Sequence, residues 1–70
     1  MTEYEFEQIK IRTVVSNRSN SQEMFEIFDL DVFGRDSKVH MGIQLNVDNP
    51  RYMRLDTANC KFWDIVGRMV

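Results

Sequence analysis

Residues Lys38 to Asp48, KVHMGIQLNVD, alternate strictly between apolar and polar side chains. The apolar positions are Val39, Met41, Ile43, Leu45 and Val47. A period of two over this length is typical of a half-buried β-strand. The stretch therefore predicts a strand over about residues 38–48, with the apolar set facing a core and His40 among the outward residues.

The stretch before it, residues 23–33 (EMFEIFDLDVF), also alternates, and the short segment Gly34–Ser37 joins the two. With the turn centred on residues 35 and 36, Phe28 lies opposite Ile43 and Leu30 lies opposite Met41. Apolar residues then face apolar residues across the pair. Because a slip of one residue would send one apolar set to the other face, this agreement predicts an antiparallel hairpin.

A third strand is expected over about residues 3–15, ahead of the polar loop SNRSNS at residues 16–21. Docking it beside residues 23–33 places Ile11 next to Phe28 and extends the apolar face. The apolar positions change phase near Glu7, which indicates a bulge or bend there. These three strands predict an antiparallel meander.

The C-terminal segment has apolar residues at spacings of three and four, which is the pattern of an amphipathic helix. They are Leu55, Ala58, Phe62, Ile65, Val66 and Met69. We expect a helix over about residues 57–69, capped by Asp56 or Thr57 and packed on one face of the meander; Asn49 followed by Pro50 is an alternative start, which would give a longer helix or a short extra turn. The predicted fold is α+β, in the order β-β-β-α, with residues 1–70 as a single domain.

Composition narrows the function classes. The chain has 70 residues, 43% of them hydrophobic, and a net charge of −2, which provides no general attraction to nucleic acid or to anionic membranes. No apolar stretch approaches the ~18 residues of a membrane-spanning helix, and residues 1–8 lack the features of a signal peptide. A soluble, cytoplasmic protein is expected.

One cysteine and one histidine are too few for an internal disulfide or a zinc site, so we expect neither a metal nor another cofactor. His40 faces Asp31 in the expected register, and the pair resembles an acid–base site. No nucleophile or phosphate-binding loop accompanies it, and a surface ion pair explains it better. Cys60 is expected to be exposed beside Asp64, whose charge disfavours a thiolate. We therefore predict no catalytic residue and no enzymatic activity.

The outward face of the predicted sheet carries more large apolar side chains than a solvated face needs. A contiguous exposed patch of this kind indicates a partner. Trp63 lies at the margin of the predicted helix stripe, where it either seals the core or anchors a contact. The predicted partner-binding residues are Phe6, Arg12, Phe25, Ile27, Phe33 and Trp63.

These observations predict a small non-enzymatic protein-binding module. A regulator or inhibitor that acts by occupying a larger protein, of the kind that phages and mobile elements encode, fits the size. A chain this short has little core of its own, so a protein partner, a homodimer, or both are expected. The alternatives are a nucleic-acid-binding domain that uses the outer sheet face, and a small enzyme centred on His40 and Asp31.

Overall fold

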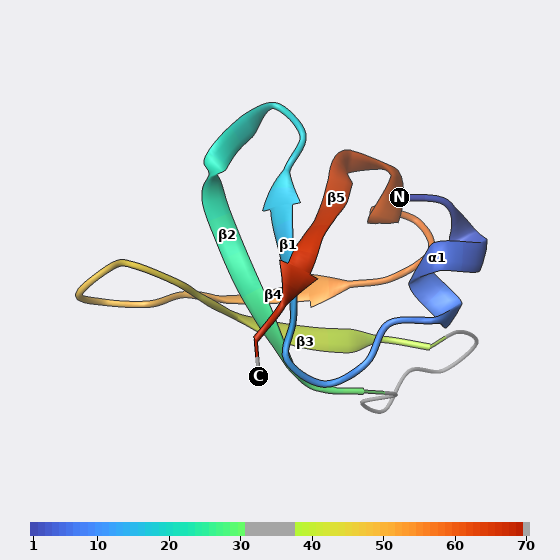
Figure 1. The fold of residues 1–70 in the computed structure, drawn as a ribbon, viewed down its shortest axis with the longest axis horizontal. Helices are drawn as coiled ribbons and strands as arrows, with labels where there is room; N and C mark the ends of the chain where they lie inside the picture. Colours follow the sequence, from blue (N-terminus) through green and yellow to red (C-terminus); the bar gives the residue numbers. More distant parts are fainter. Residues whose placement is uncertain (31–37, 70) are drawn as a thin grey trace.

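The computed structural model describes residues 1–30 and 38–69. Most of its regular structure is a single antiparallel sheet (Figure 1). In chain order the elements are α1 (Glu3–Glu7), β1 (Thr13–Asn17), β2 (Asn20–Asp29), β3 (His40–Gln44), β4 (Tyr52–Leu55), the 3-10 helix η1 (Cys60–Phe62) and β5 (Trp63–Arg68).

The strand order across the sheet is β4-β3-β2-β1-β5. The predicted three-stranded meander with a C-terminal helix is therefore wrong, because five strands are present and the only helices are α1 and the short η1 in the described part of the chain. Consecutive strands from β1 to β4 are neighbours, and β5 returns to the far side of β1. In Figure 1 β3 and β4 run across the direction of β1, β2 and β5, so the sheet is strongly bent.

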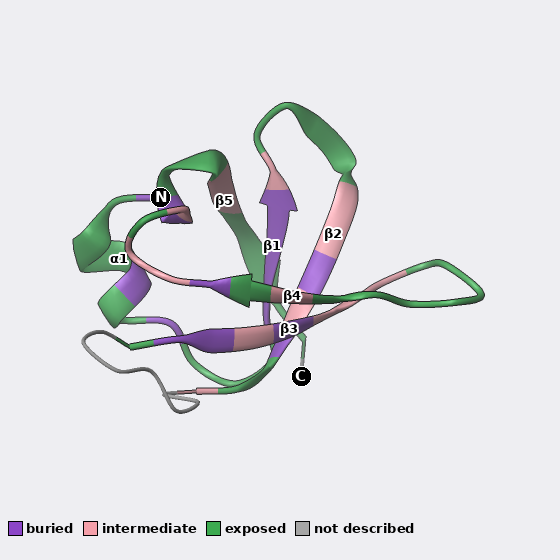
Figure 2. Cartoon of the chain, turned by 180° about the vertical axis from the view of Figure 1, so that it is seen from behind, coloured by how far each residue is buried: buried purple, intermediate pink, exposed green. Residues whose placement is uncertain are grey.

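The core fills the concave side of this bent sheet. Its largest fully buried side chains are Phe6, Val15, Ile27, Leu55 and Cys60. They come from α1, β1, β2, β4 and η1, so nearly every element contributes one. Figure 2 shows the buried residues concentrated on β1, the middle of β2 and the facing ends of β3 and β4, while most of β5 is exposed.

The predicted strand over residues 3–15 is wrong in its first half, which forms α1 instead. Thr2 and Glu5 make a capping box, in which Thr2 Oγ1 accepts from the Glu5 amide (3.1 Å) and Glu5 Oε1 accepts from the Thr2 amide (2.9 Å). Reciprocal caps of this kind satisfy amides that a first helical turn leaves unpaired. Phe6 then enters the core, and the regular strand begins only at Thr13.

The hairpin of β2 and β3 is antiparallel, as predicted, but its register is not the predicted one. Ile43 lies opposite Glu26 rather than Phe28, and the ladder is irregular between Ile27 and Asp29. Gly42 pairs with Ile27, so it lies on the concave face. β3 is shorter than the predicted 38–48, and β2 begins at Asn20, within the predicted loop, and ends at Asp29. The expected turn lies outside the described residues.

The cause of the different register is that β2 is apolar on both faces. Phe25 and Ile27 point into the core, whereas Phe28 is exposed. Since either face of β2 offered an apolar row, matching apolar with apolar did not identify the buried one. The orientation predicted for the next strand was therefore reversed, and His40 is buried.

The predicted helix over residues 57–69 is wrong as well. Only the single turn η1 is helical, and Trp63–Arg68 form strand β5. The pair Ile65–Val66 is β-branched and Gly67 follows it, three residues that disfavour a helix interior. Of the six apolar residues with this spacing only Leu55 is buried, and the others are exposed, so the spacing does not mark a buried helical face.

Candidate functional site

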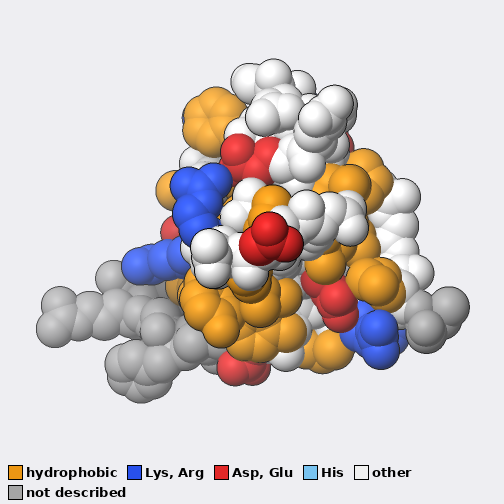
Figure 3. Space-filling model, turned by 90° about the vertical axis from the view of Figure 1, so that its left-hand side faces the viewer, with side chains coloured by type: hydrophobic (Ala, Val, Ile, Leu, Met, Phe, Trp, Pro, Cys, Tyr) orange, Lys and Arg blue, Asp and Glu red, His pale blue; other side chains and the backbone are white. Residues whose placement is uncertain are grey.

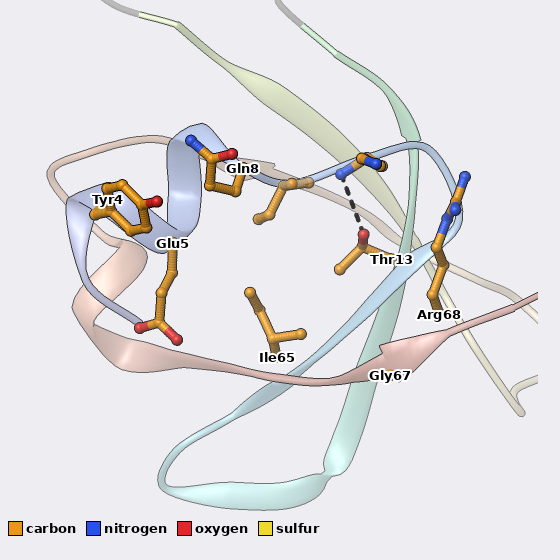
Figure 4. Close-up of a pocket in the computed structure, with 9 residues that line it drawn as sticks. Tyr4, Glu5, Gln8, Thr13, Ile65, Gly67 and Arg68 are labelled. Atoms are coloured by element: carbon orange, nitrogen blue, oxygen red, sulfur yellow. Dashed lines mark hydrogen bonds between the residues drawn. The ribbon is translucent and has the colours of Figure 1, made fainter.

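A groove lies between α1 and β5, on the concave side of the sheet. Its volume is about 470 Å³ (Figure 4). Tyr4 and Glu5 line it from α1, Ile9 and Lys10 from the segment that follows, Thr13 from β1, and Ile65, Gly67 and Arg68 from β5, with Gln8 at the helix end.

The helical side of the groove is held in place by buried anchors. Phe6 and Ile9 are buried in the core, which fixes both α1 and the segment that leaves it. Thr13 Oγ1 accepts from the Lys10 amide (3.2 Å), and the Thr13 amide donates to the Lys10 carbonyl (3.1 Å). The first of these bonds is drawn in Figure 4. Because α1 and the segment that follows it are anchored in the core, the groove forms without a partner.

The strand side of the groove is an open edge. Among the described strands, β5 pairs only with β1. The Arg18 amide donates to the Phe62 carbonyl, and the Met69 amide donates to the Arg12 carbonyl. These two bonds show which residue pairs of β1 and β5 are hydrogen-bonded to each other and which are not. Because such pairs alternate along antiparallel strands, the backbone groups of Ile65 and Arg68 point away from β1.

A bulge gives this edge its geometry. Ile65 pairs with Val15 and Arg68 pairs with Thr13, so three residues of β5 span the distance of two on β1. An extra residue in one strand changes which side chains share a face. Ile65 and Arg68 therefore both lie on the groove side, where Ile65 remains 41% exposed.

The N-terminal end of β5 is closed by residue 1. The Met1 amino group donates to the carbonyl of Cys60 (3.0 Å) and to that of Trp63. Its distance to the Asp64 carboxylate is 3.9 Å. The backbone edge that a partner can reach therefore extends from Ile65 to Arg68.

Opposite charges mark the two ends of the groove. Glu5 lies at one end, and hydrogen bonds from the Thr2 amide and hydroxyl lower the pKa of its carboxyl group, so it is ionised at neutral pH. Arg68 lies at the other end, where its Nε donates to the Ile11 carbonyl (3.1 Å). Lys10 adds a second cation to the lining. Between these ends the walls are largely apolar.

The structure does not bring the predicted partner-binding residues together on an exposed face. Phe6, Phe25 and Ile27 are buried, so their predicted exposure is wrong. Trp63 is half-buried and packs edge-on against Phe25, with ring centroids 5.4 Å apart. Each of these side chains belongs to the core or its border.

The remaining two predicted residues have different positions. Arg12 is exposed and pairs with Glu26 (Nε to Oε2, 3.5 Å) on the convex side of the sheet. Phe33 lies outside the described residues. The residues that sequence reasoning missed are Ile65 and Arg68, and the available signal for them was the β-branched pair followed by glycine.

His40 and Cys60 are both buried, contrary to prediction. His40 is 3% exposed and stacks on Phe6 (ring centroids 4.4 Å apart), with its Nε2 3.3 Å from the Phe6 carbonyl oxygen. Asp31, its expected partner, lies outside the described residues. Burial raises the pKa of the Cys60 thiol, which keeps it in the unreactive protonated form.

A second apolar feature lies away from the groove. Phe28 and Tyr52 form an edge-to-face pair, with ring centroids 5.7 Å apart, and Tyr52 is 65% exposed. Figure 3 shows hydrophobic side chains gathered on the side of the molecule where the β3–β4 connection projects, with charged side chains beside them.

Within residues 1–30 and 38–69, no group of three or more His, Cys, Asp and Glu side chains is placed to hold a metal ion. No helix in these ranges is long and apolar enough to cross a membrane. No family model matches the chain, and neither a curated protein nor a solved structure matches it significantly.

Proposed function

We propose that the protein is a non-enzymatic protein-binding module that takes up an extended segment of a partner protein along β5. The observation that carries this proposal is the open edge of β5 beside a preformed apolar groove. Addition of a strand to a sheet edge combines backbone hydrogen bonds, which provide affinity, with side-chain pockets, which provide specificity.

The groove is suited to one row of side chains from such a segment. Residues of a strand alternate between its two faces, so every second side chain would enter the groove and contact Ile9 and Ile65. The backbone groups of Ile65 and Arg68 would pair with the incoming main chain. A small regulator or inhibitor of the kind that phages and mobile elements encode, which occupies a larger protein in the cytoplasm, is the role that fits this site.

The two alternatives have less support. Phe25, on which a nucleic-acid base would have stacked, lies in the core, and the net charge is −2. His40, the centre of the enzyme alternative, is covered by Phe6. A protein segment is the ligand that uses both the edge and the groove.

Selection from a displayed library of short random peptides tests the proposal. We expect enriched peptides to bind wild-type protein and to protect the amides of Ile65 and Arg68 from hydrogen exchange. Ile65→Lys should abolish binding because it places a charge in the apolar part of the groove. Tyr52→Lys is the matched control, since Tyr52 is an exposed apolar residue on the other edge strand, and it should bind normally.

Failure to enrich any peptide, or equal loss of binding in both variants, would overturn the proposal. Measurement of the molecular mass by sedimentation identifies the other occupant that β5 could take. A dimer that the Ile65→Lys variant dissociates would show that a second copy of the chain occupies the edge instead.

A further inference from the structure

The charges at the ends of the groove define a direction along β5. The strand runs from Trp63 to Arg68, and Arg68 and Lys10 both line the groove. Figure 4 shows Glu5 and Arg68 at opposite ends, with Ile65 between them. A ligand that lies along β5 therefore meets an anionic end, an apolar centre and a cationic end in a fixed order.

The way in which strands pair then predicts the order of charged and apolar residues in the bound segment. Every neighbouring pair of strands in the described sheet is antiparallel, and we take the same orientation for an added strand. Its N-terminal end then lies at Arg68. The residues that pair with Arg68 and Ile65 are hydrogen-bonded partners, which in a regular strand are two positions apart and share one face.

We infer that the segment bound by β5 has an acidic residue, an apolar residue two positions later and a basic residue that follows beyond the last backbone pairing. This inference rests on the proposed function. The acidic side chain faces Arg68 and Lys10, the apolar one packs on Ile9 and Ile65, and the basic one faces Glu5. Charge complementarity of this kind fixes the register and orientation of a bound segment.

The sequence of β5 itself has this pattern, as Asp64, Val66 and Arg68, but a second copy cannot pair in that register because the backbone groups of Asp64 point toward β1. In the two-fold register that pairs the outward backbone groups of both Ile65 and Arg68, Arg68 lies opposite the Ile65 of the other copy. Asp64 pairs with Ser16 on the convex side and is bound by Arg18 (Nη2 to Oδ1, 2.7 Å). The cationic end of the groove would then face no acid, so a foreign segment is the better occupant.

The same displayed library tests the inference when it is screened against three proteins. Wild type should enrich peptides with an acid, an apolar residue two positions later and a base that follows them. Arg68→Glu should lose the preference for an acid at the first of these positions. Arg51→Glu, which changes an exposed arginine beside the other edge strand, should keep the wild-type pattern.

A selected peptide and a version with its two end charges exchanged provide the quantitative test. Fluorescence anisotropy should show binding about tenfold weaker for the exchanged peptide, because each end then meets a like charge. Enriched peptides without any charge order, or equal affinity of the two versions, would overturn this inference while leaving the proposed function intact. Absence of any enriched peptide would instead overturn the proposed function.

Discussion

Gly42 is the residue at which the corrected register has its most direct consequence. A Cβ atom at this position would lie 3.2 Å from Phe25 Cβ and 3.3 Å from Met53 Cγ and Sδ. These contacts are closer than ordinary van der Waals packing, so the two neighbours would have to move. The sequence showed that apolar and polar residues alternate along this strand, but it placed Gly42 on the outer face. There a larger side chain would have had room.

Gly42→Val should destabilise the protein by ~1–3 kcal/mol, the usual cost of overpacking a core. Urea unfolding measures the change. Gly67→Val is the matched control, because nothing lies within 4 Å of a Cβ at Gly67. Equal losses in the two variants would contradict the placement of Gly42 on the concave face.

Asp64 provides a prediction about pH. The hydrogen bonds from Arg18 lower the pKa of its carboxyl group below the ordinary value of 3.8. A carboxyl group with a lowered pKa in the folded state adds stability above its unfolded pKa and loses it as the pH falls through the folded pKa.

Asp64→Asn should therefore be less stable than wild type at pH 7, and the difference should shrink as the pH falls below 3.8. Urea unfolding at a series of pH values measures this difference. Asp48→Asn, at an exposed position between β3 and β4, is the control. A difference for Asp64→Asn that does not change with pH would show that the ion pair is not its cause.

At the scale of elements, local signals predicted some features and not others. The antiparallel pairing of β2 and β3 followed from their alternating side chains. The capping box of α1 was also present in the sequence as Thr2 and Glu5, but the alternation of Glu3, Glu5 and Glu7 resembled a strand face and obscured it. A five-residue helix is too short to show helical periodicity, so its buried anchor Phe6 is what makes it stable.

Phe6→Ala tests that anchor. Phe6 is fully buried and stacks on His40, so its removal should cost ~3–5 kcal/mol. Tyr4→Ala, in the same helix at a position that is 75% exposed, should stay within ~0.5 kcal/mol of wild type. Thermal or urea unfolding compares the two. A small effect for both would mean that α1 contributes little to the core.

The whole molecule depends on contacts that no local pattern contains. Strand β5 pairs with β1 across most of the length of the chain, for example Thr13 with Arg68. The groove combines α1 with β5, from the two ends of the sequence. Because periodicity reports only the burial of neighbouring residues, it could neither show this pairing nor predict that Ile65 and Tyr4 line one site.

A bound segment should raise the stability of the whole domain, and this is the last prediction. A ligand that binds only the folded state stabilises it by ~2.7 kcal/mol when its free concentration is a hundred times Kd. For a domain of this size that corresponds to an increase in Tm of roughly 10–20 °C. Differential scanning fluorimetry with a selected peptide measures the shift, and the charge-exchanged peptide at the same concentration should produce a smaller one.

The increase in stability is expected to be large relative to that of the free domain, because a short chain buries a small fraction of its surface and an added strand covers the exposed β5 edge. A peptide that binds by anisotropy but leaves Tm unchanged would show that it also binds the unfolded chain, and the assignment of the site to the folded β5 edge would then be wrong.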